Sequence, residues 1–242
     1  MPDLRKLRSP ALIRKALRRR LFARRMRRIR AAWVPGLERL GSEYGGWVVP
    51  AGMIGSGWLC YSAGAGFDVS FDMALLARGA RVRAFDPLDI FRDMAVREAG
   101  GDPRYSFSEV AIATEDGPVT MFGRQDEEIG SVSAVNLYGV ETTHEIPGRA
   151  LPSLMDEHGD ERVDLLKLDI EGSEYEVLDR LDLPSLGVKV LCVELHENAS
   201  PRRAKSLLGS IAEQGYEIVH TGEESNFTLL SRELAAHARA AA

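Results

Sequence analysis

Cysteine and long apolar runs are both scarce in this chain. Its 242 residues include two cysteines, Cys60 and Cys192, each inside an apolar stretch. Two isolated thiols cannot build a tetrahedral zinc site, and they indicate buried thiols in a reducing compartment. No apolar run approaches the roughly 20 residues that a membrane-spanning helix requires. Arginines interrupt the N-terminal segment, so no secretory signal is expected. These absences favour a cytoplasmic location.

Acidic residues are nearly absent from the first 30 positions. Residues 1–30 contain 13 Lys/Arg and one acid, whereas the rest of the chain contains 18 Lys/Arg and 35 Asp/Glu, a balance of −17. Apolar residues recur at helical spacing through residues 3–33, which predicts a basic amphipathic helix within residues 1–35. Such a helix could lie on the acidic body or contact an anionic membrane peripherally, at the inner membrane face. RNA or partner binding is a further option, although aromatic residues are too few to indicate specific nucleic-acid recognition.

Composition divides the remaining chain into three parts. Residues 36–57 are rich in Gly and Pro and predict a linker, and residues 233–242 form an Ala-rich tail. In the body, residues 58–232, apolar runs alternate with helical patterns before two final strands, which predicts an α/β fold whose parallel sheet has an antiparallel edge. One of these runs predicts a third strand over residues 105–113. The polar stretch 123–148 is too long for an ordinary connection and predicts a lid or substrate loop.

The first strand and helix of the body have the features of a nucleotide site. An apolar run from Trp58 ends in Gly64-Ala-Gly66, a helical pattern follows, and a second strand ends at Asp86, 20 residues after Gly66. Glycines allow a ligand to approach the backbone, and the carboxylate can accept hydrogen bonds from a ribose diol. Nicotinamide and S-adenosylmethionine sites both start in this way. The third glycine of the nicotinamide motif is missing, so a dehydrogenase is the less favoured reading.

A second motif places acids at the end of a later strand. The sequence Leu166-Lys-Leu-Asp-Ile-Glu-Gly-Ser-Glu174 is an apolar strand that ends in Asp169 and Glu171 before a helix. The next strand ends in Val193-Glu-Leu-His196. Because parallel strands share a carboxyl edge, these side chains should meet near the nucleotide site.

These residues resemble the FkbM family of S-adenosylmethionine-dependent methyltransferases, from about Trp58 to Leu230. Residues 166–174 look like the family's K-x-D-x-E-G-x-E signature, and residues 193–196 look like its E-x-H strand ending. The resemblance implies S-adenosylmethionine as cofactor. It also implies a Rossmann-like class I methyltransferase fold, with a mostly parallel seven-stranded sheet, an antiparallel terminal strand and helices on both faces, beside the basic N-terminal helix.

The first glycine loop departs from the commoner family form, D-x-G-A-N-x-G. Ser62 replaces the acid and Gly66 replaces the Asn, which is closer to a branch with the pattern Y-S-x-G-x-x-x-D-x-S-F-[DE] followed by F-D-P. Asp68 or Asp72 is therefore expected to supply the carboxylate for the methionine ammonium group. The expected cofactor-binding residues are Ser62, Gly64, Gly66, Asp68, Asp72, Asp86 and Asp169.

Four residues are candidates for the chemistry. His196 is the preferred general base, because imidazole titrates near neutral pH. Asp169 and Glu171 could contact the ligands, although Glu171 or Ser173 could instead cap the following helix. Lys167 is costly in an apolar strand unless it pairs with Asp169 or Glu194.

Weaker candidates and a metal were also weighed. His144, in the expected lid, and Asn226, in a terminal strand, are less favoured site residues. No metal site is expected, because the acidic strand end at Asp169 lacks an adjacent Asp-Asn pair.

The leading function is O-methylation of a hydroxyl on a sugar, glycolipid or secondary metabolite. The alternative is a non-catalytic Rossmann-like adaptor, tethered to a membrane or a glycosyltransferase by its basic arm. The altered loop between Gly64 and Asp72 motivates this alternative.

Overall fold

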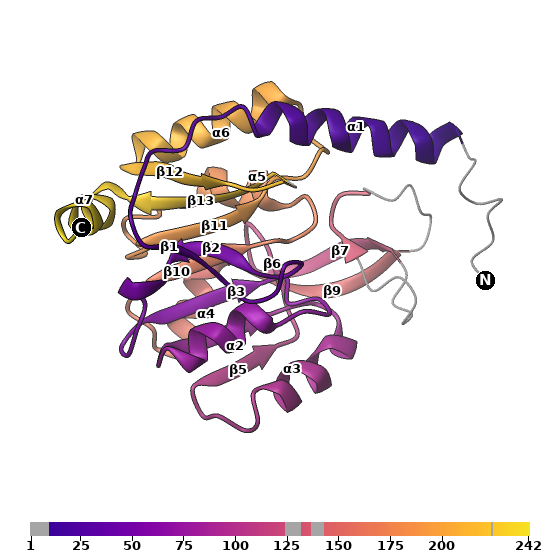
Figure 1. The fold of residues 1–242 in the computed structure, drawn as a ribbon. Helices are drawn as coiled ribbons and strands as arrows, with labels where there is room; N and C mark the ends of the chain where they lie inside the picture. Colours follow the sequence, from indigo (N-terminus) through magenta and orange to yellow (C-terminus); the bar gives the residue numbers. More distant parts are fainter. Residues whose placement is uncertain (1–9, 124–131, 137–142, 224) are drawn as a thin grey trace.

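A seven-stranded sheet runs through the centre of the computed structural model, which describes residues 10–123, 132–136, 143–223 and 225–242 (Figure 1). Its order is β12-β13-β11-β10-β3-β4-β5. Strands β11, β10, β3, β4 and β5 are parallel, and β13 runs antiparallel to both β11 and β12. This arrangement confirms the expected Rossmann-like sheet. The strand bounds are β3 Leu59–Ala63, β4 Arg81–Phe85, β5 Tyr105–Ser108, β10 Leu165–Leu168, β11 Val190–Glu194, β12 Tyr216–Thr221 and β13 Asn226–Ser231.

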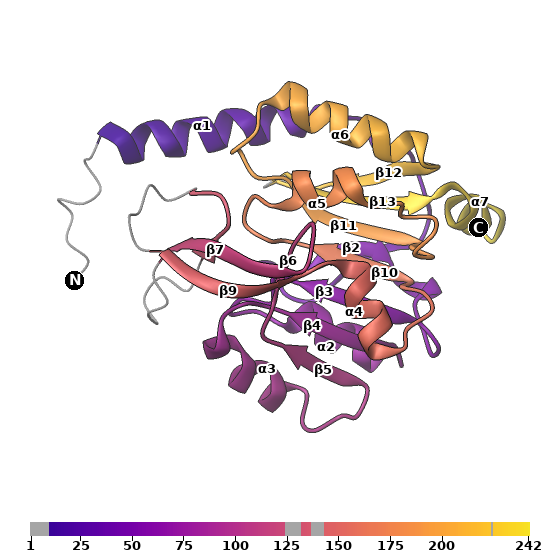
Figure 2. The ribbon, with the colours of Figure 1, turned by 180° about the vertical axis from the view of Figure 1, so that it is seen from behind.

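Helices cover both faces of this sheet (Figures 1 and 2). The helices are α1 Pro10–Met26, α2 Ser70–Ala77, α3 Arg92–Glu98, α4 Leu151–His158, α5 Glu174–Arg180, α6 Pro201–Glu213 and α7 Arg232–Ala240, with short 3₁₀ turns η2 Ala51–Met53 and η3 Asp89–Phe91. The local sequence explains where some of these helices begin or end. Ser200 accepts a hydrogen bond from the Arg203 amide at the start of α6, with Pro201 in the first turn, and Gly159 ends α4 in the left-handed conformation.

Alternate residues of the central strands enter two separate cores. Tyr61, Leu166 and Leu191 pack in one core with residues of α4, α5 and α6. Cys60 and Leu165 pack in the other core with residues of α2 and α7. This period of two is the geometry of a β-strand, and each fully buried aliphatic side chain contributes about 1.5–3 kcal/mol. Both faces of the sheet are thus covered mainly by apolar side chains, with Ser62, Lys167 and Thr228 as buried polar exceptions within the strands.

A small second sheet follows β5. Its order is β6-β9-β7-β8, with β6 Ala111–Ile112, β7 Gly117–Gly123, β8 Val132–Ser133 and β9 Thr143–Arg149. The single strand expected over residues 105–113 is wrong, because the chain turns after Ser108, where the Val110 amide donates to the Ser108 carbonyl. The expected lid, residues 123–148, contains β8 and most of β9, and its residues 124–131 and 137–142 lie outside the described residues.

Three segments outside the expected body also differ from the prediction. Helix α1 is shorter than residues 3–33, of which residues 3–9 lie outside the described part. The expected linker contains a hairpin, β1 Leu37–Leu40 with β2 Trp47–Pro50, because Trp47 and Val49 are buried in the core beside α2. The expected Ala-rich tail forms most of α7, capped by the Ser231 side chain and anchored by buried Ala235. In the described part of the chain, each helix is too short or too polar to span a bilayer.

Candidate active site

A cavity of about 990 Å³ opens at the carboxyl ends of β3, β4, β10 and β11. Its walls include the glycine loop after β3, the acids after β4 and β10, and His196 after β11. The β1–β2 turn, the segment 110–114 and Arg19 of α1 complete the lining. Strands that are far apart in the sequence thus bring their polar ends to one space, as expected for a parallel sheet.

Gly64 fixes the loop at the end of β3. Its φ is +80°, and an added Cβ would lie 1.7 Å from the carbonyl oxygen of Asp169, so no other residue fits without moving the backbone. The Gly64 amide donates to the Phe85 carbonyl at 2.9 Å. The buried Lys167 ammonium donates to the carbonyls of Gly64 and Ala63, at 2.6 and 3.1 Å. The loop is therefore held between β4 and β10.

Asp86 ends β4 and lines the cavity beside that loop. Its carboxylate accepts hydrogen bonds from the Gly66 amide at 3.1 Å and from the Leu88 amide at 3.0 Å. Burial raises the pKa of Asp86 to about 6, although these amides and the charge of Lys167 favour the ionised form. Each carboxylate oxygen has a second lone pair, so Asp86 can still accept from a ligand hydroxyl.

The other expected acids of this region have different surroundings. Asp68 lines the cavity, and its carboxylate accepts from the Ser42 hydroxyl and the Gly45 amide, at 2.5 and 3.2 Å. Burial disfavours its charge, but hydrogen bonds from Ser42, Ser70 and Gly45 outweigh it and lower the pKa of Asp68. Ser62 and Asp72 are buried and are missing from the described residues that line the cavity. Asp68, rather than Asp72, thus lines the cavity.

Lys167 forms the ion pair that its burial requires. Its Nζ lies 4.0 Å from a carboxylate oxygen of Asp169, at the limit of an ion pair. The two carbonyls of the glycine loop are its closer partners. Lys167 therefore acts on the site through the loop conformation and through the charge it places beside Asp169.

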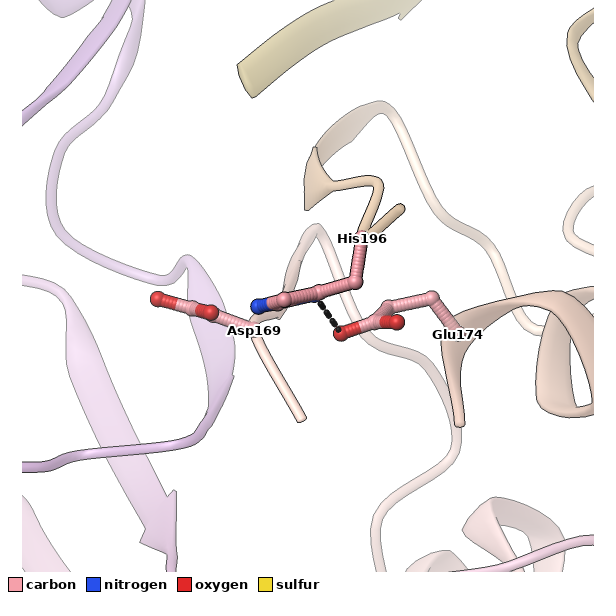
Figure 3. A group of neighbouring side chains, drawn as sticks. All are labelled: Asp169, Glu174 and His196. Atoms are coloured by element: carbon pink, nitrogen blue, oxygen red, sulfur yellow. Dashed lines mark hydrogen bonds and ion pairs between the residues drawn. The ribbon is translucent and has the colours of Figure 1, made fainter. Parts of the chain in front are cut away.

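His196 lies between carboxylates at the end of β11. Figure 3 shows its imidazole between Glu174 and Asp169. The Nδ1 atom is 3.0 Å from Glu174, and Nε2 is 3.4 Å from Glu171 and 3.8 Å from Glu194. Burial lowers the pKa of His196, but the nearby charges of Glu174, Glu194 and Glu171 outweigh burial and raise that pKa well above 6.5. The surrounding carboxylates thus favour the protonated form of the ring.

Glu174 orients that imidazole, and both of its oxygens accept hydrogen bonds. It is fully buried, and its two oxygens accept from the Ile170 amide at 2.8 Å, the Gly172 amide at 3.0 Å and His196. These bonds close the turn in which Glu171 has a φ of +54°. Neither Lys167 nor Arg180, the partners considered from the sequence, contacts Glu174 in the described structure.

The comparison with protein-family models decides the family. Residues 62–218 match the model described as the methyltransferase FkbM domain, which is more than half of the chain.

The chain belongs to the FkbM methyltransferase family.

Solved structures offer only distant matches to this FkbM protein. An FkbM methyltransferase from Methylobacillus flagellatus is 14% identical with a TM-score of 0.45, and the match covers 72% of this chain and 43% of that one. A SAM-dependent methyltransferase from Aquifex aeolicus is 11% identical, with a TM-score of 0.36 and coverages of 73% and 82%. The fibrillarin pre-rRNA processing protein of Methanococcus jannaschii is 11% identical, with a TM-score of 0.42 and coverages of 84% and 86%. No curated protein matches the chain.

S-adenosylmethionine is the cofactor of this family, and the cavity of the FkbM protein fits it. The glycine loop leaves backbone close to the cavity, and buried Asp86 stands at the adjacent strand end, where it can accept from ribose hydroxyls. Leu88, Val110 and Ile112 provide apolar lining for a flat base.

The donor set of the FkbM site does not suit a metal ion. Ligand atoms of Asp169, Glu174 and His196 lie within 4.8 Å of one another in the described structure. However, both oxygens of Glu174 already accept hydrogen bonds, from the amides of Ile170 and Gly172 and from His196. The Lys167 ammonium adds positive charge beside Asp169. We therefore assign no role to a metal.

Sequence reasoning missed the walls that the hairpin and α1 contribute to the FkbM site. Tyr44, Trp47 and Arg19 line the cavity, yet none was a candidate. The apolar run Trp47-Val-Val-Pro50 was the available signal, hidden among glycines. Of the weaker candidates, Asn226 lines the cavity and His144 is missing from its described lining, with Nε2 3.1 Å from the Gly123 carbonyl oxygen.

Proposed function

We propose that this protein transfers the methyl group of S-adenosylmethionine to a hydroxyl oxygen of a sugar, glycolipid or secondary metabolite. The supporting observation is the meeting of two features in one cavity: the glycine loop with Asp86, and the carboxylates after β10 and β11. The first suits the cofactor. The second suits a hydroxyl acceptor, because a hydroxyl must lose a proton on methylation, whereas a neutral amine can react without a base.

In this proposal Gly64, Gly66 and Asp86 hold the cofactor, and Asp68 receives its ammonium group. When bound, S-adenosylmethionine supplies an electrophilic methyl group for in-line displacement. The chain contributes by holding the acceptor oxygen close to that group. Lys167 keeps the loop carbonyls of Ala63 and Gly64 in place.

We assign the proton acceptor to Asp169. It lines the cavity next to Gly64, and its side chain is 31% exposed, so a substrate hydroxyl can reach it. With the cofactor bound, Asp169 would take the proton that the acceptor hydroxyl releases as its oxygen is methylated. His196 was the base favoured from the sequence, but its Nδ1 atom lies 3.0 Å from Glu174 and its Nε2 atom 3.4 Å from Glu171, and these carboxylates raise its pKa and favour the protonated ring. We assign His196 and Glu171 to positioning the acceptor.

Cofactor binding is the first test. Calorimetry with S-adenosylmethionine should give binding that Asp86→Ala weakens by about a hundredfold, since a buried ribose contact is lost. Asp89→Ala is the matched control, because Asp89 is exposed and missing from the described cavity lining. Absence of binding to the wild type would overturn the proposal.

Transfer itself is tested with methyl-labelled cofactor and a panel of hydroxyl and amine acceptors. O-methyl products, identified by NMR, are expected, with Asp169→Asn lowering kcat by about a hundredfold while cofactor binding persists. N-methyl products would contradict the assignment. Cofactor binding without turnover on any acceptor would instead favour the adaptor reading.

A further inference from the structure

The outward side of helix α1 combines exposed leucines with arginines. The packed side consists of Phe22 and Met26, which are buried, with partly buried Ile29 beside them. Leu17 and Leu21 are 56% and 49% exposed, and Arg24 and Arg28 follow them at helical spacing. We call these four residues the outward face of α1, including Arg28, which lies in the turn directly after the last helical residue, Met26. Because one helix side is fixed to the body, the outward face is turned to solvent along the projecting helix (Figure 1).

The arginines of this face differ from those of the body. Arg83, Arg203 and Arg239 each form an ion pair with a neighbouring carboxylate. By contrast, Arg24 and Arg28 have no ion-pair partner among the described residues, although the chain beyond residue 30 has a balance of −17. The acidic body therefore leaves this positive charge available to an external anion.

We propose that the outward face of α1 docks on an anionic lipid bilayer. Leucines can enter the boundary between headgroups and acyl chains while adjacent guanidinium groups meet lipid phosphates. A nucleic acid would offer phosphates to the arginines but no apolar medium to Leu17 and Leu21. The helix lies in the membrane plane in this mode and does not cross the bilayer.

The same helix borders the active-site cavity, which gives the docking a direction. Arg19 lines the cavity, and Arg18 donates to the backbone carbonyl of Glu197, itself a lining residue, at 3.0 Å. Arg19 is two positions along the helix from Leu17 and from Leu21, about 200° around its axis, so a docked α1 leaves the cavity on the side that faces away from the bilayer. The docking itself does not depend on the proposed methyl transfer.

Vesicle co-sedimentation of the full chain tests the docking. We expect binding to vesicles of equal parts phosphatidylcholine and phosphatidylglycerol, little binding to phosphatidylcholine alone, and release at high salt. Arg24→Glu/Arg28→Glu should reduce the partition coefficient by about tenfold or more. Leu17→Ser/Leu21→Ser should reduce it several-fold, because apolar insertion is lost while the charge stays.

A matched control lies on α3, at the opposite end of the molecule from α1 (Figure 1). Val96→Ser/Arg97→Glu removes an apolar side chain that is 47% exposed and reverses one charge, and it should leave binding unchanged. Unaltered melting temperatures exclude misfolding as the cause of any loss. The proposal is overturned if vesicles do not bind, if both α1 double variants bind as the wild type does, or if the chain binds RNA but not vesicles.

Discussion

The acidic edge of the central sheet and helix α1 both carry charge, yet they use it in opposite ways. At the edge, the charges are paired internally: His196 lies between Glu171, Glu174 and Glu194, and Lys167 contacts the glycine loop and Asp169. On α1, the arginines of the outward face have no ion-pair partner among the described residues. Internal pairing fixes backbone and protonation states, whereas unpaired surface charge is available for a partner. Substitutions at the edge should therefore affect the fold and those on α1 should not.

Gly64→Ala should cause the largest loss of stability, because Gly64 belongs to the loop whose carbonyls bind the Lys167 ammonium. The new Cβ would meet the Asp169 carbonyl oxygen at 1.7 Å, in a backbone conformation with φ +80°. We expect a loss of about 4 kcal/mol in unfolding free energy by urea titration, with loss of cofactor binding. Gly101→Ala is the control, since Gly101 has φ +76° and nothing within 4 Å of the added atom, and about 1 kcal/mol is expected there. Equal losses in both variants would contradict the described loop contact.

Glu174→Gln should have the next largest effect. The substitution keeps the shape but turns an amide group toward N–H donors, so a buried donor at Ile170, Gly172 or His196 loses its acceptor. A loss of about 2–3 kcal/mol is expected. NMR titration should also show the pKa of His196 moving down. Glu176→Gln, on the exposed side of the same helical turn, should change neither quantity.

The pairing at His196 should also appear as pH-dependent stability. The pKa of His196 is raised on folding, so the stabilisation is complete below about pH 6.5 and is lost as the pH rises through the folded pKa. Each unit of that raise contributes about 1.4 kcal/mol. Urea midpoints of wild type and His196→Gln should converge toward alkaline pH, and the exposed His237→Gln should follow the wild type. A pH-independent difference between wild type and His196→Gln would exclude the raised pKa.

The central strands and the strand-end acids could be predicted from sequence, because local patterns encode them. The strands β3, β4, β10 and β11 are apolar runs that end in glycine or acid, and α6 begins at the capping pair Ser200-Pro201. The hairpin of β1 and β2 has only one weak local signal, the apolar run that forms β2. Its strands are four residues long, and they are held by distant contacts such as the Thr228 hydroxyl donating to the Val48 carbonyl at 2.7 Å.

The protonation of the site was also beyond the sequence. His196 was expected to be a base because an isolated imidazole titrates near neutral pH. Its actual state depends on a turn in which Glu174 folds back to the amides of Ile170 and Gly172 and thereby meets the Nδ1 atom. A spacing of 22 residues between Glu174 and His196 gives no sign of that contact.

The smallest effect on stability is expected on α1. Arg24→Glu/Arg28→Glu reverses two charges, yet the melting temperature should stay within about 2 °C of the wild type, because neither arginine has an ion-pair partner among the described residues. Arg83→Gln offers the contrast. Arg83 is 15% exposed and binds Asp160 through two nitrogens, at 2.5 and 2.9 Å, so its loss should lower the melting temperature clearly. If the melting temperature of Arg24→Glu/Arg28→Glu were as low as that of Arg83→Gln, Arg24 and Arg28 would stabilise the fold. That result would contradict the contrast between paired charges in the body and unpaired charges on the outward face of α1.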